Sequence, residues 1–237
     1  MRILDIDMDF FQSDIHSWGD DSSTHLIDDT FSVWEDKQFI DFIESKCGLS
    51  VERPIKGRIF NSHVNTYWFC KELIDKGKLS VPFDITHIDA HSDLAFSLSV
   101  ENYTFWKSFA GKNRERFLAG TLFETSDNLR FIDSGSYLLA MALNQWLRTI
   151  SYVYHPELKE LDVFEYAVKC VKPNKKFKFR FFDDNVSIPN LVLETIHPTE
   201  FKKDEPYDFV CVAISPAYTV TEINRLVDIL KKYIIEI

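Results

Sequence analysis

Apolar residues along the chain recur at two spacings, one typical of strands and one typical of helices. Short apolar or alternating runs predict strands over residues 3–11, 58–60, 81–86, 150–154, 177–182, 191–196 and 209–214. Helical spacing predicts helices over residues 31–46, 64–76, 134–148, 157–171 and from 220 towards the C-terminus. Strands that alternate with helices favour an α/β fold, a three-layer α/β/α sandwich with a mostly parallel sheet, in one domain spanning residues 1–237.

Signals at the ends of these segments support the pattern. Gly48 and Gly77 follow the first two predicted helices, where a glycine commonly ends the last turn. Thr219 and Glu222 have the spacing of a capping box, which places the start of the last helix near residue 220. Residues 209–214 form a nearly unbroken apolar run, as expected of a strand covered on both faces. Residues 12–29 are polar and predict a loop, and residues 94–128 show no clear period.

The first predicted strand carries an aspartate at every second position, namely Asp5, Asp7 and Asp9. Side chains alternate between the faces of a strand, so these three would share one face. Like charges on one face repel, and a buried aspartate without a partner is costly. The apolar residues between them and the two phenylalanines that follow indicate an interior strand. A bound cation is therefore the expected counter-charge.

A second polar motif follows the strand predicted at 81–86. Asp89, His91 and Asp93 stand at positions i, i+2 and i+4, so an extended chain would direct all three to one side. Carboxylate and imidazole together form a mixed oxygen and nitrogen donor set, which suits manganese, iron or zinc better than calcium or magnesium. A strand end with solvated polar side chains is the alternative interpretation of any one of these residues.

His63 lies where a predicted strand gives way to a helix, which is where ligands bind in open α/β sheets. Together the candidate metal ligands are Asp7, Asp9, His63, Asp89, His91 and Asp93. Six ligands fill two metal sites better than one, and two neighbouring metals that share a hydroxide favour hydrolysis. We therefore expect Asp7, Asp89 and His91 to be catalytic.

Composition indicates which partners and which cellular compartment to expect. The chain of 237 residues has a formal net charge of -10, which argues against nucleic acid as a partner because such proteins need a basic surface. Its four cysteines, Cys47, Cys70, Cys170 and Cys211, form no close pair, as expected of buried thiols in a reducing compartment. No signal peptide or membrane span is evident, so a cytoplasmic protein without a membrane partner is expected.

The segment Asp89 to Asp93, with the letters DAHSD, resembles the second metal motif of the arginase/ureohydrolase superfamily. The segment Asp5 to Asp9 is similar to that superfamily's Ser-x-Asp-x-Asp strand, with Asp5 standing where the serine is. In ordinary arginases the Asp-x-Asp strand comes later in the chain. The order found here, together with the Ser-Pro-x-Tyr-Thr segment at 215–219, resembles the circularly permuted arginase-like family that includes the peptide arginases.

This resemblance implies a fold, a cofactor and a reaction. The fold would be arginase/deacetylase-like with permuted strand order, and the cofactor two Mn²⁺ ions, although the ligand set alone also admits iron, zinc or cobalt. Asp7 and Asp89 would bridge the ions, Asp9 and His91 would complete one site, and His63 with Asp93 the other. The implied activity is conversion of arginine in a peptide or protein to ornithine and urea through a metal-bridging hydroxide; a small guanidino substrate is the other candidate.

The sequence departs from the superfamily where the substrate guanidinium is bound. Ureohydrolases that act on guanidinium hold it with a carboxylate near the end of a late strand, where this chain has Ala217 beside Ser215. Asp183, Asp184 and Glu194 are the carboxylates that could replace it, and Ser215 is the fourth candidate for substrate binding.

Three further expectations stay open. His16 or His25, in the polar segment 12–29, could move a proton to or from the site. The strand ending in Asp7 and Asp9 also resembles haloacid-dehalogenase phosphatases, in which the first aspartate is the nucleophile and Asp183 with Asp184 would hold magnesium. A non-catalytic metal-binding relative is the remaining alternative, which the missing carboxylate makes plausible.

Overall fold

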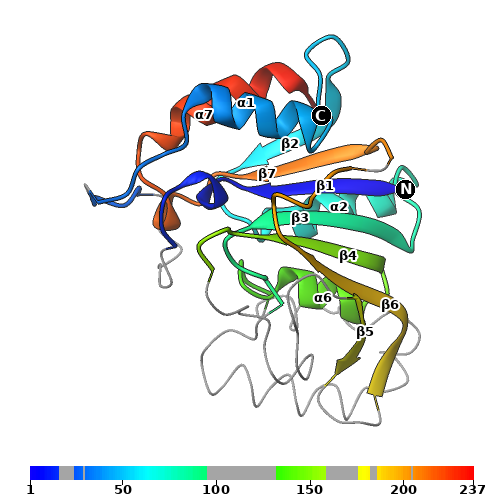
Figure 1. The fold of residues 1–237 in the computed structure, drawn as a ribbon. Coiled ribbons are helices and arrows are strands. Elements are labelled where there is room, and N and C mark those ends of the chain that lie inside the picture. Colours follow the sequence, from blue (N-terminus) through cyan, green and yellow to red (C-terminus); the bar gives the residue numbers. More distant parts are fainter. Residues whose placement is uncertain (16–23, 29, 95–131, 159–175, 182–185, 204) are drawn as a thin grey trace.

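The computed structural model of the chain describes residues 1–15, 24–28, 30–94, 132–158, 176–181, 186–203 and 205–237. Their strands are β1 Arg2–Asp7, β2 Ile55–Phe60, β3 Phe83–Asp89, β4 Leu147–Tyr154, β5 Lys176–Phe181, β6 Val186–Ile196, β7 Phe209–Ala213 and β8 Ile234–Glu236. They form one sheet in the order β5-β6-β4-β3-β1-β7-β2-β8 (Figure 1). Every neighbouring pair is parallel except β5 and β6, which are antiparallel. The predicted α/β class with a mostly parallel sheet is confirmed.

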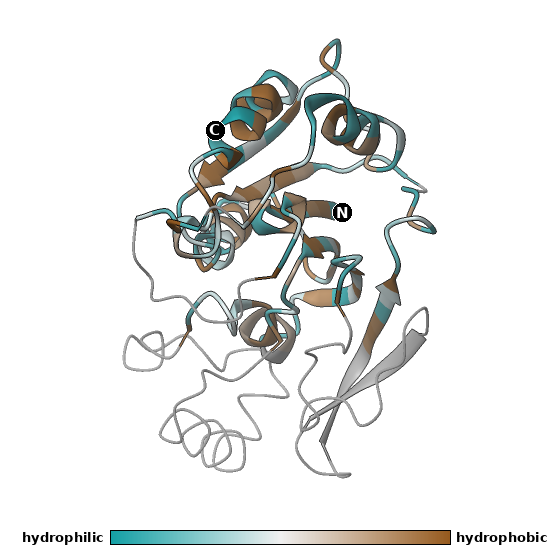
Figure 2. Ribbon diagram, turned by 60° about the vertical axis from the view of Figure 1, so that its left-hand side comes forward, coloured by the Kyte–Doolittle hydropathy of each residue, from teal (hydrophilic) through white to brown (hydrophobic). Residues whose placement is uncertain are grey.

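The described helices are α1 Asp36–Ser45, α2 Asn65–Asp75, α6 Tyr137–Leu143 and α7 Ile223–Leu230, with 3₁₀ turns η1 Met8–Phe11, η2 Pro216–Tyr218 and η3 Lys231–Tyr233. The buried residues of α7 recur at helical spacing: Ile223, Leu226, Val227 and Leu230. This spacing gives the helix one apolar stripe, which it buries against the rest of the protein. The helices near the C-terminus accordingly carry both hydrophobic and hydrophilic colours in Figure 2.

Buried apolar side chains form two clusters. One includes residues of α2 and α6, and the other includes residues of α1 and α7, which lie side by side at the top of Figure 1. Successive residues of β1 enter different clusters, Ile3 the first and Leu4 the second, because side chains alternate between the faces of a strand. Both faces of the central strands are therefore covered.

β1 lies at the centre of the sheet, between β3 and β7 (Figure 1). All of its residues after Arg2 are buried, including Asp5 and Asp7. The prediction of an interior first strand is confirmed. Its two aspartates therefore lie in surroundings that disfavour an unpartnered charge.

Several element boundaries differ from the predictions. The first strand ends at Asp7 rather than at residue 11, and the chain continues as the 3₁₀ turn η1. The predicted helix 134–148 is shorter, since α6 ends at Leu143 and β4 begins at Leu147. The predicted capping box does not form: the hydroxyl of Thr219 donates to the carbonyl oxygens of Ile214 and Ser215 instead. Most of the predicted helix 157–171 and of the segment 94–128 lies outside the described residues.

Two other sequence predictions concern glycines and cysteines. Gly48 and Gly77 have φ angles of +66° and +64°, as expected of residues that end helices. Cys47, Cys70 and Cys211 are free and buried, whereas Cys170 lies outside the described residues. In the part of the chain that the structure describes, no helix is long and apolar enough to cross a lipid bilayer.

Candidate metal centre

The candidate ligands come from strand ends along one edge of the sheet. Asp7 is the last residue of β1, and Asp89 is the last residue of the adjacent β3. Because these strands are parallel, their carboxyl ends lie at the same edge. His63 follows β2 three residues after its end, and Ser215 follows β7 by two residues. Four separate segments therefore converge at this edge.

Three carboxylates surround one imidazole nitrogen. His63 Nδ1 lies 3.0 Å from Asp7 Oδ2, 3.0 Å from Asp89 Oδ2 and 3.0 Å from Asp93 Oδ2. All four residues are buried, with exposed fractions of 6% or less. Among the described residues, His63 Nδ1, Asp89 Oδ2 and Asp93 Oδ2 are buried atoms without a hydrogen-bond partner.

A second group shares Asp89 with the first. His91 Nδ1 lies 3.0 Å from Asp9 Oδ2 and 3.7 Å from Asp89 Oδ1. Backbone N–H groups hold these carboxylates: that of His91 donates to Asp89 Oδ1 and that of Ala90 to Asp9 Oδ1. The side chain of His91 is 23% exposed, so this group is the more open of the two.

The structure thus brings all six predicted metal ligands together. The atoms of Asp7, His63 and Asp89 lie within 4.8 Å of one another, as do those of Asp9, Asp89 and His91. Buried carboxylates and imidazoles that face one another with unsatisfied atoms need a cation or protons between them. These buried groups could hold a metal ion.

The backbone reaches this arrangement differently from the prediction. The prediction that residues 3–11 form one strand with Asp5, Asp7 and Asp9 on one face is wrong, and residues 89–93 do not continue as an extended chain. Asp9 lies in the turn η1, because Asp7 Oδ1 accepts a hydrogen bond from the Asp9 N–H and caps that turn. Asp93 lies beyond β3 with a φ angle of 49°, in the left-handed region. The chain therefore curls around the site instead of passing it in a straight line.

Several ionisable side chains lie buried and close together at this site, and their pKa values are shifted as a result. Burial, together with Asp7 and Asp89, raises the pKa of Asp9 well above its ordinary value. Burial and the neighbouring Asp89 raise the pKa of Asp93 to about 7. Asp89 behaves in the opposite way: although burial alone would raise its pKa, the histidines around it hold the pKa below its ordinary value.

The two candidate histidine ligands are surrounded by carboxylates. Burial alone would lower the pKa of His63, but Asp5 and Asp7 raise it well above its ordinary value. Burial likewise opposes the effect of Asp89 and Asp9 on His91, whose pKa is also raised. Protons therefore compete with a metal for these ring nitrogens.

A second polar layer lies beneath the ligands, and the sequence did not identify its role. Asp5 accepts hydrogen bonds from Thr66 Oγ1 at 3.0 Å and from Tyr137 OH at 2.5 Å, and it lies close to ring nitrogens of His63 and His87. All five residues are essentially buried, with exposed fractions of 1% or less. The alternating pattern pointed to Asp5, but only the fold shows which side chains surround it.

The predicted substrate-binding residues do not gather at one place. Ser215 donates a hydrogen bond of 2.5 Å from Oγ to Asp7 Oδ2, so it contacts a candidate ligand. Ala217, which stands where a carboxylate was sought, is buried. Asp183 and Asp184 lie outside the described residues.

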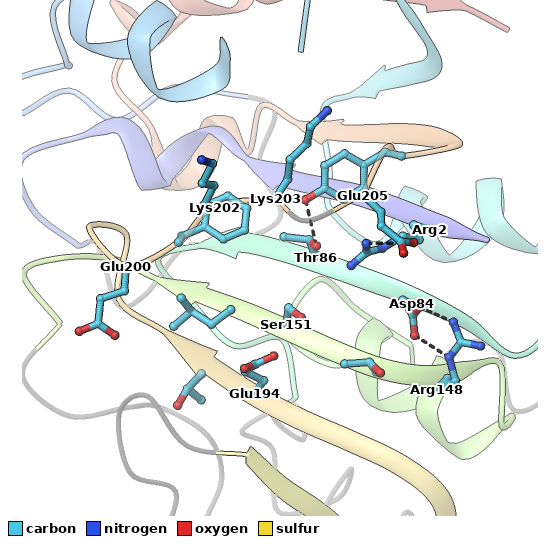
Figure 3. A pocket seen from close by; sticks show the side chains of 15 residues that line it. Arg2, Asp84, Thr86, Arg148, Ser151, Glu194, Glu200, Lys202, Lys203 and Glu205 are labelled. Carbon is cyan, nitrogen blue, oxygen red and sulfur yellow. Dashed lines mark hydrogen bonds and ion pairs between the residues drawn. The ribbon is translucent and has the colours of Figure 1, made fainter. Parts of the chain in front are cut away.

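Glu194 lies in a separate polar cavity of about 660 Å³ over β3, β4 and β6 (Figure 3). In the register of the sheet, Glu194 lies opposite Ser151 on β4, and Ser151 lies opposite Thr86 on β3. The three residues therefore form a row across the floor of the cavity. Ser151 is three positions before Tyr154, the partner of Asp89. At about 3.3 Å per residue, Glu194 is displaced by roughly 10 Å along the sheet and by two strands from Asp89. The structure does not bring Glu194 to the candidate metal ligands.

The two candidate proton carriers stay predictions. His25 Nδ1 lies 3.0 Å from the carbonyl oxygen of Thr219, and His25 Nε2 lies 3.1 Å from Asn224 Nδ2. Both ring nitrogens therefore tie the segment before α1 to the segment around α7. His16 lies outside the described residues.

Comparison with known proteins adds no relative: no family model, curated protein or solved structure matches this chain.

Proposed function

We propose that the chain is a dinuclear-metal hydrolase of arginase-like type, which hydrolyses the guanidinium group of arginine in a peptide or protein to give ornithine and urea. The observation that supports the proposal best is the set of three buried atoms without hydrogen-bond partners, His63 Nδ1, Asp89 Oδ2 and Asp93 Oδ2. Such atoms are rare in folded proteins because each carries a desolvation cost. A divalent cation held between them would remove that cost.

The donor set fits the proposed pair of manganese ions. Asp7, His63, Asp89 and Asp93 would hold one ion, while Asp9, Asp89 and His91 would hold the other. Mixed carboxylate and imidazole ligands also suit iron, zinc or cobalt. When bound, two such ions would supply an activated water molecule and polarise the group that it attacks.

The residues of the chain would have distinct roles in this proposal. Asp89 touches both groups of ligands and would keep the two halves of the site together. The hydroxyl of Ser215 fixes the orientation of Asp7. His91 is the partly exposed ligand, and its ring packs edge-on against that of Tyr218 with centroids 5.3 Å apart. An arginine-containing peptide, or a small guanidino compound, would therefore approach from the side of His91.

The finer features of the fold and setting belong to the same proposal. The three-layer arrangement with permuted, arginase-like strand order is supported by the central position of β1, whose end carries Asp7. A cytoplasmic location is the natural setting for free buried thiols such as Cys47 and Cys211.

The phosphatase alternative is less well supported by the same contacts. His63 and His91 lie 3.0 Å from Asp7 and Asp9 respectively, and magnesium prefers a shell of oxygen atoms. The non-catalytic alternative agrees with the buried Ala217 and is separated from the proposal by an activity measurement.

Metal content is the first test. Protein purified without chelator is expected to contain manganese or a related divalent metal, and EDTA-treated protein is expected to bind Mn²⁺ in calorimetry. Asp89→Asn keeps the size of the side chain and removes a charge shared by both groups, so it should abolish binding of at least one ion. Asp84→Asn, on the same strand and paired with Arg148, is the matched control and should bind like wild type.

Activity is the second test. The manganese-loaded protein is expected to release urea from arginine-containing peptides and leave ornithine, detected by mass spectrometry, and Asp89→Asn is expected to release none. A protein that binds manganese yet releases no urea from peptides or free guanidino compounds would be a non-catalytic relative. Magnesium-dependent phosphate release that survives Asp89→Asn would support the phosphatase instead.

A further inference from the structure

The ring of His63 is held on two sides by different parts of the chain. Its Nδ1 faces the carboxylates of the candidate metal centre, whereas its Nε2 faces the buried layer beneath them. On that side Nε2 lies 3.2 Å from Asp5 Oδ1 and 3.0 Å from Tyr137 OH. The ring of His63 also packs against that of Tyr137, with centroids 4.8 Å apart.

The hydrogen bonds of this layer determine where the protons lie. The Tyr137 hydroxyl has one proton, which it donates to Asp5 Oδ2, so its oxygen is left as an acceptor towards His63. The other neighbour of His63 Nε2 is a carboxylate oxygen of Asp5, which is also an acceptor. Nε2 must therefore carry a proton and donate it.

Asp5 is itself held by two hydroxyl groups. Thr66 Oγ1 donates to Oδ1 and Tyr137 OH donates to Oδ2, while His87 Nδ1 lies 3.0 Å from Oδ2. Each oxygen of Asp5 therefore accepts a hydrogen bond from a hydroxyl, which fixes the carboxylate in place. A carboxylate fixed in this way fixes in turn the imidazole that donates to it.

We propose that Asp5 and Tyr137 are positioning residues, which hold His63 with its proton on Nε2 and direct the lone pair of Nδ1 to a metal ion. This inference rests on the proposed metal site and assigns the ligand atom within it. The alternative tautomer, with the proton on Nδ1, would place Nε2 as an acceptor beside the oxygen of Asp5 and would lose that hydrogen bond. Tyr137 belongs to α6, so this helix takes part in the site although it supplies no candidate ligand.

The test uses Zn²⁺ as the probe, because it is diamagnetic, and the full chain labelled with ¹⁵N on histidine. Long-range ¹⁵N–¹H spectra of zinc-loaded wild type are expected to show His63 bound through Nδ1 and protonated at Nε2. Tyr137→Phe removes only the hydroxyl and Asp5→Asn keeps the size of the side chain. Both are expected to weaken zinc binding by about 10- to 100-fold and to give zinc-loaded protein in which His63 coordinates through a mixture of Nδ1 and Nε2.

Tyr152→Phe is the matched control. Tyr152 is also fully buried, and its ring packs on His87 with centroids 5.4 Å apart, so its substitution removes a phenol hydroxyl from the same region. It is expected to leave zinc affinity within about twofold of wild type and to leave the tautomer of His63 unchanged.

The outcomes separate this inference from the proposed function. Zinc coordination through His63 Nε2, or unchanged affinity and tautomer in both variants, would overturn the positioning role while leaving the metal site intact. Wild-type protein that binds neither zinc nor manganese would overturn both proposals. If a variant fails to fold, the inference is still tested by which ring nitrogen of His63 binds zinc in the wild type, because that measurement needs no substitution.

Discussion

Ser215 combines a strained backbone with a functional contact. Its φ and ψ angles of 48° and 63° lie in the left-handed region, which costs a residue other than glycine about 1 kcal/mol or more. Its hydroxyl donates to Asp7 Oδ2, a candidate metal ligand. Asp93, another candidate ligand, also has a positive φ angle. Strain of this kind tends to persist at sites where the surrounding contacts require it.

We therefore expect Ser215→Gly and Ser215→Ala to differ from each other in stability but to have similar affinities for metal. Both remove the hydroxyl and should lower Mn²⁺ affinity to a similar extent. Glycine relieves the backbone strain and alanine does not, so Ser215→Gly should be the more stable by about 1 kcal/mol in urea unfolding. Wild-type Mn²⁺ affinity in both variants would show that the hydroxyl does not orient Asp7.

At the residue scale the sequence predicted the candidate ligands better than it predicted the residues that hold those ligands in place. The spacing of acidic and histidine residues, read with a family resemblance, pointed to Asp7, Asp9 and four others that the structure brings together. It could not identify Tyr137, whose hydroxyl meets Asp5 from 132 positions away. A tyrosine in an apolar helix has the same local pattern whether its hydroxyl reaches a carboxylate or not, so only the tertiary fold distinguishes the cases.

At the scale of elements, the main error was to extend the first strand through residue 11. Alternation of apolar and acidic residues continues to Phe10, so the pattern carried no stop signal at Asp7. The strand stops because Asp7 accepts a hydrogen bond from the Asp9 N–H, a local bond that competes with the sheet. The core strand β7 was predicted because its burial on both faces leaves a nearly unbroken apolar run, and β1 because apolar residues alternate with its aspartates.

The contact between β2 and α2 provides a test of pH dependence. Lys76 and Arg58 both donate to Glu72 and lower its pKa to about 2 from an ordinary value of 4.5. A lowered folded-state pKa stabilises the fold above the unfolded value, and the effect is lost as pH falls towards about 2. Glu72→Gln should therefore be less stable than wild type in urea at neutral pH, with a smaller difference at about pH 3. An equal difference at both pH values would contradict this assignment.

Strand pairing between β2 and β7 depends on a glycine. A side chain at Gly57 would meet the carbonyl oxygen and side chain of Val210 on the adjacent strand, and the backbone oxygen cannot move aside. Gly57→Ala should therefore destabilise the protein by about 3 kcal/mol. Gly77→Ala meets no atoms and suffers only from its positive φ angle, so its cost should be about 1 kcal/mol. Equal unfolding midpoints for the two variants would show that β2 can shift away from β7.

On the scale of the whole molecule, strand order is what the sequence could not supply. The candidate ligands lie at or just after the ends of β1, β2 and β3, yet β2 is separated from β1 by β7, a strand from near the end of the chain. Nothing local in β7 indicates that it lies next to β1. The convergence of residues 7 to 93 with Ser215 is thus a property of the topology, which the motifs could suggest only through resemblance to a known fold.

This convergence predicts that metal binding stabilises the entire fold and does so increasingly as pH rises. The pKa of Asp93 is raised to about 7 from 3.8, and those of His63 and His91 are raised as well. A raised folded-state pKa stabilises the fold at low pH, and for Asp93 this contribution is lost as pH rises from about 4 to about 7. EDTA-treated protein should therefore lose the contribution of Asp93 over that range and the contribution of the two histidines at higher pH. Mn²⁺ binds the deprotonated ligands, so it should restore stability where the protons leave.

The measurement is the Mn²⁺-induced increase in melting temperature at about pH 6 and about pH 8. At 100 times the dissociation constant, binding to the folded state alone contributes about 2.7 kcal/mol, and the same metal concentration should give a larger shift at the higher pH because affinity rises as protons leave. Asp84→Asn should reproduce the wild-type shifts, while Asp89→Asn should give a much smaller one at either pH. A shift that is equal at both pH values, or greater at pH 6, would mean that manganese binds away from the groups that Asp93, His63 and His91 form.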